Sequence, residues 1–160
     1  MWDPASGIKF ANNEPAAPAF RDSQIYRFCQ EHRGAGVQHV ALNVANIVDA
    51  VRDMRARGVA FMPTPAAYYQ QLPARVRELG IAKIDEPVVA LEELAILVDG
   101  AGPGRYLLQI FMREAEALFD DASAGPLFIE LIQRKGDRGF GAGNFRALFE
   151  CIERTQTQAA

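Results

Sequence analysis

Three short apolar segments limit the possible folds of this chain more than any other feature, because each alternates like a half-buried β-strand. They cover residues 37–44 (VQHVALNV), 106–112 (YLLQIFM) and 127–134 (LFIELIQR). One face of each segment is aliphatic or nearly so, and the other face holds a polar side chain among apolar neighbours. These polar residues are His39, Gln109 and Glu130. We expect a sheet with one packed face and one face that forms the wall of a pocket.

The order of the other elements indicates an α+β fold. A helix is predicted over 46–58, followed by a short strand (59–62) and a helical insertion at about 64–93. Segments 91–100 and 106–112 predict two strands joined by a glycine-rich turn, and a closing helix follows the last strand. A strand–helix unit followed by several strands matches a curved sheet that wraps around something.

The composition argues against a nucleic-acid-binding, membrane-spanning or secreted protein. The 160 residues carry a net charge of −3, and the 17 Lys and Arg residues are spread along the chain, which argues against a nucleic-acid surface. No segment approaches the roughly 20 apolar residues of a membrane span, and no secretory signal opens the chain. Cys29 and Cys151 fit neither a disulfide framework nor a zinc site, so reduced thiols and a cytoplasmic location are expected.

The position of Glu130 on an apolar strand raises the question of how its carboxylate is stabilised. A buried carboxylate without a partner costs several kcal/mol, so Glu130 is expected to be paired, protonated or bound to a metal ion. Imidazole and carboxylate groups are ligands for divalent first-row metals, and Gln109 would add a neutral hydrogen-bonding group. Periodicity alone leaves plainer interpretations open, since a strand histidine is often a satisfied structural residue and a strand glutamate often faces solvent.

Four segments in order resemble the C-terminal part of the 4-hydroxyphenylpyruvate dioxygenase family: GAGVQHVALNV, LLQIF, FIELIQR and GFGAGNFRALFE. The resemblance runs from about residue 7 to 153. It implies the vicinal oxygen chelate fold, a βαβββ module. It also implies an iron(II) enzyme that converts 4-hydroxyphenylpyruvate and O2 to homogentisate and CO2 in tyrosine and phenylalanine catabolism. In this family two histidines and one glutamate hold the iron.

The resemblance assigns expected roles to eleven residues. The iron ligands are His39 and Glu130. The catalytic residues are Gln109, Gln38, Asn13 and Gln24. The substrate pocket is formed by Phe111, Phe128, Phe140, Asn144 and Phe145. The substrate expected from the resemblance is a small aromatic 2-oxo acid.

The resemblance also implies a division of the chain. Residues 1–33 correspond to the end of a preceding module (a strand at Ile8–Ala11 and a short helix), 34–135 to the metal-bearing module, and 136–160 to a C-terminal gate helix.

The family's other histidine ligand lies upstream of these segments, and His32 is the one further histidine here, in a turn that is expected to be solvated. We therefore expect little turnover from this chain alone, and either a homo-oligomer or an N-terminal segment that covers the open site. Two alternatives stay open: a non-catalytic module of the same fold that dimerises or binds an aromatic acid, and a hydroxymandelate-synthase-like enzyme.

Overall fold

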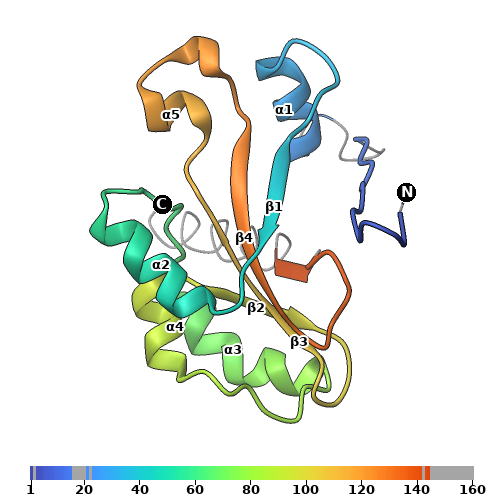
Figure 1. The fold of residues 1–160 in the computed structure, drawn as a ribbon, viewed down its shortest axis with the longest axis vertical. Helices are drawn as coiled ribbons and strands as arrows, with labels where there is room; N and C mark the ends of the chain where they lie inside the picture. The colour runs from blue at the N-terminus through green and yellow to red at the C-terminus, as the bar shows by residue number, and fades with distance from the viewer. Residues whose placement is uncertain (2, 16–20, 22, 142, 145–160) are drawn as a thin grey trace. The chain divides into compact units, whose positions relative to one another are not determined.

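A computed structural model describes residues 1, 3–15, 21, 23–141 and 143–144 (Figure 1). The chain divides into two compact units, Met1–Gln38 with Ala115–Leu127, and His39–Glu114 with Phe128–Ala160. The first unit contains α1 (Gln24–Glu31), α5 (Ala115–Phe119) and the short 3-10 helix η1 (Ala122–Ala124). Of the gate helix predicted over 136–160, residues 142 and 145–160 lie outside the described residues; residues 136–141 are not helical, and 143–144 are.

The short strand predicted at Ile8–Ala11 is reduced to a single bridge residue, Lys9. The carboxylate of Asp3 accepts hydrogen bonds from the backbone N–H groups of Ala5 and Ser6, which turns the chain back on itself. As a result, the backbones of Ile8 and Phe10 bond to Asp3 and to the first residue instead of joining a sheet.

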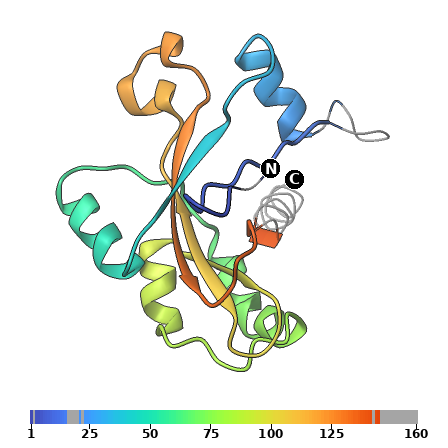
Figure 2. The same ribbon diagram turned by 45° about the vertical axis from the view of Figure 1, so that its right-hand side comes forward.

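The second unit is built on one mixed sheet. Its strands are β1 (His39–Asn43), β2 (Leu97–Gly100), β3 (Tyr106–Phe111) and β4 (Phe128–Lys135). Their spatial order is β1-β4-β3-β2, with β1 parallel to β4 and the other neighbours antiparallel (Figures 1 and 2). The parallel pairing of the first and last strands closes a βαβββ unit, as predicted. The segment predicted as a strand over 59–62 contributes a single bridge, between Phe61 and Met112.

Three helices cover one face of this sheet: α2 (Ile47–Ala56), α3 (Ala66–Glu78) and α4 (Val88–Leu94). Their apolar side chains form one core with the strand residues that point toward them. This core includes Val51, Tyr69, Leu72, Leu91, Leu108, Ile110 and Leu131. Since side chains alternate along a strand, the neighbours Gln109 and Glu130 point to the opposite face. No helix in the described ranges has the length and apolar character that a membrane crossing requires.

The strand predicted to begin at residue 91 begins later, at Leu97. Pro87 precedes the first turn of α4, where its missing N–H is not needed, and the helix runs on to Leu94. Ala95 ends it in the left-handed conformation, with φ of 60°. The apolar residues 91 and 94 therefore contribute to the core from a helix, with the spacing of one helical turn.

Gln133 of β4 ties the sheet to the start of α2. Its side-chain oxygen accepts a hydrogen bond from the Ile47 N–H at 3.0 Å, and its side-chain nitrogen donates to the Ala45 carbonyl at 2.7 Å. Both bonds satisfy backbone groups next to the helix terminus, where no helical partner exists. Asn46 completes the cap by accepting from the Asp49 N–H.

Gln133→Ala is therefore expected to lower the free energy of unfolding by about 2–4 kcal/mol, because it leaves two backbone groups without their partners. Chemical denaturation of both proteins measures this difference. Gln30→Ala, at an exposed position of α1, should change it by less than about 0.5 kcal/mol. Equal effects of the two substitutions would contradict the tie between β4 and α2.

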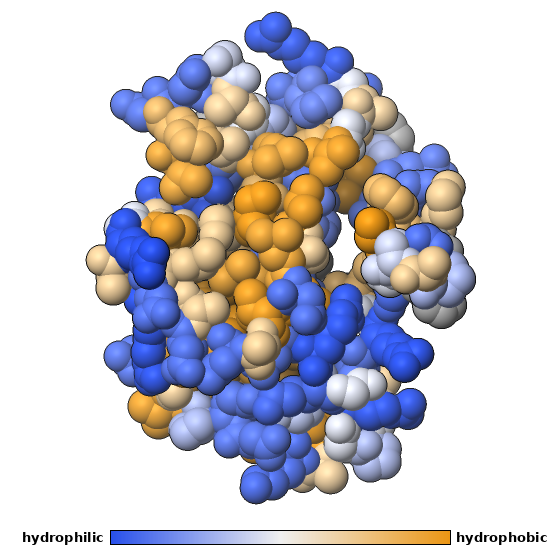
Figure 3. All heavy atoms as spheres, in the orientation of Figure 1, coloured by the Kyte–Doolittle hydropathy of each residue, from blue (hydrophilic) through white to orange (hydrophobic). Residues whose placement is uncertain are grey.

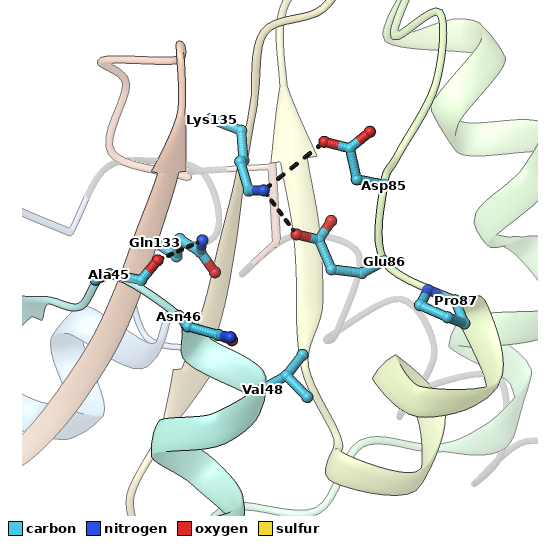
Figure 4. Close-up of a pocket in the computed structure, with 8 residues that line it drawn as sticks. All are labelled: Ala45, Asn46, Val48, Asp85, Glu86, Pro87, Gln133 and Lys135. Carbon is cyan, nitrogen blue, oxygen red and sulfur yellow. Dashed lines mark hydrogen bonds and ion pairs between the residues drawn. The ribbon is translucent and has the colours of Figure 1, made fainter.

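An open pocket of about 370 Å³ lies beside Gln133 on the helix-covered face (Figure 4). There Lys135 Nζ pairs with Glu86 Oε1 at 3.2 Å and with Asp85 Oδ2 at 3.7 Å. Gln133 and Lys135 alternate with Glu130 along β4 and so face away from it. This pocket is therefore separate from the polar site predicted from the sequence.

Candidate metal site

Two strands bring the predicted ligands together. His39 is the first residue of β1, and β1 pairs with β4 in a register that places Ala41 opposite Glu130. Because residues two apart in a strand share a face, His39 and Glu130 lie on the same side of the sheet. His39 Nε2 is 3.5 Å from Glu130 Oε2. The two side chains come from positions 91 residues apart in the sequence.

Two phenyl rings flank the pair. The imidazole of His39 stacks on Phe128, with ring centres 5.1 Å apart and an angle of 13° between the ring planes. Phe111 meets Phe128 edge-on at 5.8 Å. Both phenylalanines are buried, at 2% exposure for Phe111 and 7% for Phe128. They therefore form an apolar wall that lowers the water content beside the two donor atoms.

The second carboxylate oxygen of Glu130 is held by Gln109. Gln109 Nε2 donates to Glu130 Oε1 at 2.6 Å and to the backbone carbonyl of Phe140 at 3.0 Å. The oxygen of the same amide accepts from Asn144 Nδ2 at 2.6 Å. Gln109, Glu130 and Asn144 are each 2% exposed or less. The amide thus occupies Oε1 and leaves Oε2 directed toward His39.

Burial dominates the electrostatics of the pair. It raises the pKa of Glu130 to about 7, although the hydrogen bond from Gln109 and the charge of Arg134 act in the opposite direction. Burial also lowers the pKa of His39. A neutral imidazole is the form that binds metals, and a nearby cation would favour the ionised form of the carboxyl group. With His39 neutral, its contact with Glu130 is not an ion pair.

The pair has the donor chemistry of a partial metal site. A separation of 3.5 Å lies within the roughly 4 Å that two metal–ligand bonds of about 2 Å each can span. Imidazole nitrogen with carboxylate oxygen suits iron(II) and neighbouring first-row metals. Within the part of the chain that the structure describes, no cluster of three or more His, Cys, Asp or Glu side chains could hold an ion. The residues therefore fit two positions of a metal centre.

The structure collects most, not all, of the predicted site residues. His39, Gln109, Glu130 and Asn144 form one connected polar group, and Phe111 and Phe128 line it. The Phe140 ring is half exposed, and its backbone meets Gln109. Asn13, Gln24 and Gln38 belong to the first unit, so their roles stay predictions. Phe145 lies outside the described residues.

Three residues of the polar group were not predicted from the sequence. Tyr68 and Arg75 of α3 and Asp99 of β2 are linked to Asn144, directly or through one another. The pattern YYQQLPAR shows aromatic and basic residues in a helix, which is typical of ordinary packing and solvation. The sequence contains no signal that joins these residues to a segment about 70 residues away.

No protein-family model matches the chain. The curated relatives it matches include a 4-hydroxyphenylpyruvate dioxygenase of Pseudomonas aeruginosa, 45% identical over 157 residues. That alignment covers 98% of this chain and 40% of the relative. A 4-hydroxyphenylpyruvate dioxygenase of Dictyostelium discoideum is 43% identical over 154 residues, covering 96% of this chain and 40% of the relative. The chain thus spans about two fifths of the length of these relatives.

Two solved structures also resemble this chain. A triple mutant of 4-hydroxymandelate synthase from Streptomyces coelicolor is 40% identical and superimposes with a TM-score of 0.60, covering 83% of this chain and 34% of that chain. A xylose isomerase-like TIM barrel/4-hydroxyphenylpyruvate dioxygenase fusion protein gives a TM-score of 0.59 at 27% identity, covering 77% of this chain and 18% of that chain. Sequence and fold together show that nearly the whole chain is similar to about two fifths of 4-hydroxyphenylpyruvate dioxygenases, and that it has an α+β fold of the vicinal oxygen chelate type.

Proposed function

We propose that this chain is the C-terminal portion of an iron(II)-dependent dioxygenase that converts 4-hydroxyphenylpyruvate and O2 to homogentisate and CO2. The observation that carries the proposal is the pair formed by half-buried His39 and buried Glu130, with its nitrogen and oxygen donors 3.5 Å apart on a phenylalanine-lined wall. Burying a carboxyl group costs free energy, and a cation bound between Glu130 and His39 would offset that cost. The similarity to dioxygenases over nearly the whole chain supports the identity of the metal and the substrate.

The described residues would each have a definite task. His39 Nε2 and Glu130 Oε2 would hold the metal ion, which supplies the binding of the 2-oxo acid and of O2 and the oxidative chemistry. Gln109 keeps the other carboxylate oxygen of Glu130 in place. Phe111 and Phe128 would exclude water and offer apolar contact to the substrate ring. Phe140 and Asn144 would close the site from the C-terminal side.

We propose that the third protein ligand of the iron is a histidine outside these 160 residues. His32 does not have the surroundings of a ligand, since it is exposed at the end of α1 and its ring stacks on Phe28 at 5.1 Å. With two ligands the chain would bind the ion weakly, and turnover by the chain alone would be low. This proposal agrees with the partial coverage of the relatives.

The apolar surface of β1 supports a partner for this chain. β1 ends the sheet, and Val40 and Leu42 are 43% and 48% exposed. Figure 3 shows apolar side chains gathered around this strand. An edge strand with apolar side chains is a surface that proteins normally cover. We propose that a further segment of the same protein, or a second copy, covers it, and that the assembly acts in the cytoplasm.

A chimera tests the function directly. This chain replaces the matching 40% of the Pseudomonas aeruginosa dioxygenase, so that the remaining part comes from the relative. We expect O2 consumption with 4-hydroxyphenylpyruvate and formation of homogentisate, and we expect neither when the chimera also carries Glu130→Gln. The unchanged relative is the positive control.

The product that the chimera forms distinguishes between the candidate activities. The match to a 4-hydroxymandelate synthase structure favours that activity as the second candidate, and formation of 4-hydroxymandelate would replace our proposal with it. A folded, iron-loaded chimera that forms neither product would contradict both and leave a non-catalytic module.

A further inference from the structure

A buried chain of hydrogen bonds leads from Glu130 to helix α3. Glu130 Oε1 accepts from Gln109 Nε2, and Gln109 Oε1 accepts from Asn144 Nδ2, each at 2.6 Å. Asn144 Oδ1 lies 3.1 Å from the hydroxyl of Tyr68 and 3.4 Å from Arg75 Nη2. We call the two amides, Gln109 and Asn144, the amide relay. It joins the candidate metal ligand to a helix on the other side of the edge strand β2.

The amide relay has a direction. A carboxamide has a donor end and an acceptor end, and either end can be turned toward a neighbour. Arg75 donates to Asn144 Oδ1, and the single hydroxyl hydrogen of Tyr68 is shared between Asn144 Oδ1 at 3.1 Å and the Val98 carbonyl at 3.0 Å. The NH2 group of Asn144 therefore faces Gln109. Gln109 must then present its oxygen to Asn144 and its own NH2 group to Glu130. The Phe140 carbonyl also accepts from this NH2 group and holds Gln109 in the same direction. If Asn144 turned over, its oxygen would face the oxygen of Gln109, and this repulsion would loosen the hold of Gln109 on Glu130.

The far end of the relay is fixed to the sheet. The Tyr68 hydroxyl accepts from the Val98 N–H at 2.8 Å and lies 3.0 Å from the Val98 carbonyl. Arg75 Nη2 donates to Asp99 Oδ1 at 3.2 Å, and Asp99 Oδ2 accepts from the Gly143 N–H at 2.9 Å. Because Val98 and Asp99 belong to β2, the donors that face Asn144 cannot move independently of the sheet.

We propose that Tyr68 is a positioning residue for the metal site: its hydroxyl, together with Arg75, sets the direction of the amide relay and thereby holds Glu130 with Oε2 turned toward His39. This inference rests on the proposed function, since it takes Glu130 as a metal ligand. Tyr68 does not touch the metal or the substrate in this role. It acts through Asn144, and the orientation of Asn144 adds to the hold that the Phe140 carbonyl already gives the Gln109 amide.

Tyr68→Phe tests the inference, and the neighbouring residue provides a matched control. Tyr69 is also buried in α3, and its hydroxyl donates to the Ile96 carbonyl at 3.1 Å, outside the relay. Tyr69→Phe therefore removes the same atom from the same helix without altering the direction of the amides. Two quantities are measured: the affinity for Co²⁺ by calorimetry on the chimera described above, in which the relative supplies the further ligand and which is called wild type when it has no substitution, and the NMR resonances of the Gln109 side-chain NH2 group on the 160-residue chain.

We expect Tyr68→Phe to weaken Co²⁺ binding about tenfold, as loss of an outer-shell partner commonly does. The Gln109 NH2 resonances should shift or begin to exchange faster. Tyr69→Phe should leave the affinity within about twofold of wild type and the resonances in place. If Tyr68→Phe does not fold, Arg75→Met removes the other donor and should change both readouts in the same direction.

The possible results distinguish the claim about Tyr68 from the claim about the metal site. Co²⁺ binding by the wild type with identical behaviour of both Tyr→Phe variants would overturn the role of Tyr68 and leave the metal site intact. A wild type that binds no Co²⁺ would refute the metal site, and the Gln109 resonances then decide on the relay alone. Resonances that move with Tyr68→Phe support a directed relay, and resonances that stay in place refute it.

Discussion

Glu130→Gln is expected to make the metal-free protein more stable while it removes metal binding. Burial raises the pKa of Glu130 from 4.5 to about 7, so the folded state binds this proton more tightly than the unfolded state does. The free energy of unfolding therefore decreases as the pH rises from about 4.5 to 7, and the loss stays at higher pH. Glutamine has nearly the same shape, carries no charge and escapes this penalty.

The expected gain at pH 8 is about 2 kcal/mol, with almost none at pH 4. Chemical denaturation at the two pH values, with a chelator present, measures it. The Co²⁺ affinity of the chimera should fall by at least about a hundredfold, because a neutral amide replaces a charged ligand. Glu92→Gln, at an exposed position of α4, is the control and should change neither quantity. If Glu130→Gln instead destabilised the protein at pH 8, Glu130 would be a structural residue.

Gly141→Ala is expected to damage the site and the fold together. Gly141 has φ of 68°, and an added Cβ would overlap the side-chain amide of Gln109. The substitution therefore adds left-handed backbone strain to a clash with the group that holds Glu130. We expect the free energy of unfolding to fall by about 2–4 kcal/mol, with a clear loss of Co²⁺ affinity.

Gly104→Ala measures the effect of left-handed backbone strain without a steric clash. Gly104 has the same φ of 68°, but an added Cβ would meet no atom within 4 Å. It should cost about 1 kcal/mol and leave Co²⁺ binding unchanged. Thermal or chemical unfolding combined with calorimetry gives both values for each variant. Equal effects at the two positions would mean that the approach of Gly141 to Gln109 is not needed for the site.

Strand alternation was sufficient to predict the face that carries the site. Placing His39, Gln109 and Glu130 on one side of the sheet needs only the two-residue period, and the structure has them there. The pairing of β1 with β4 cannot be read from that period, because register depends on hydrogen bonds between distant segments. The specific distance between His39 and Glu130 therefore required the structure.

The errors have local causes. Residues 91–94 have the apolar content of a strand, but Pro87 and the left-handed Ala95 enclose them in a helix. The Ile8–Ala11 segment alternates like a strand, but the turn at Asp3 leaves its backbone bonded to neighbouring residues. The contact of Tyr68 with Asn144 joins positions 76 residues apart and depends on the path of the chain after β4. Neither periodicity nor composition describes that path.

The most direct test of the central claim is anomalous X-ray scattering at the iron edge, from crystals of the chimera, which supplies the third ligand, prepared with iron(II) under anaerobic conditions. We predict a single strong peak about 2.0–2.2 Å from both His39 Nε2 and Glu130 Oε2, which disappears in Glu130→Gln crystals. The absence of a peak at this pair, in crystals whose solution contains excess iron(II), would contradict the account.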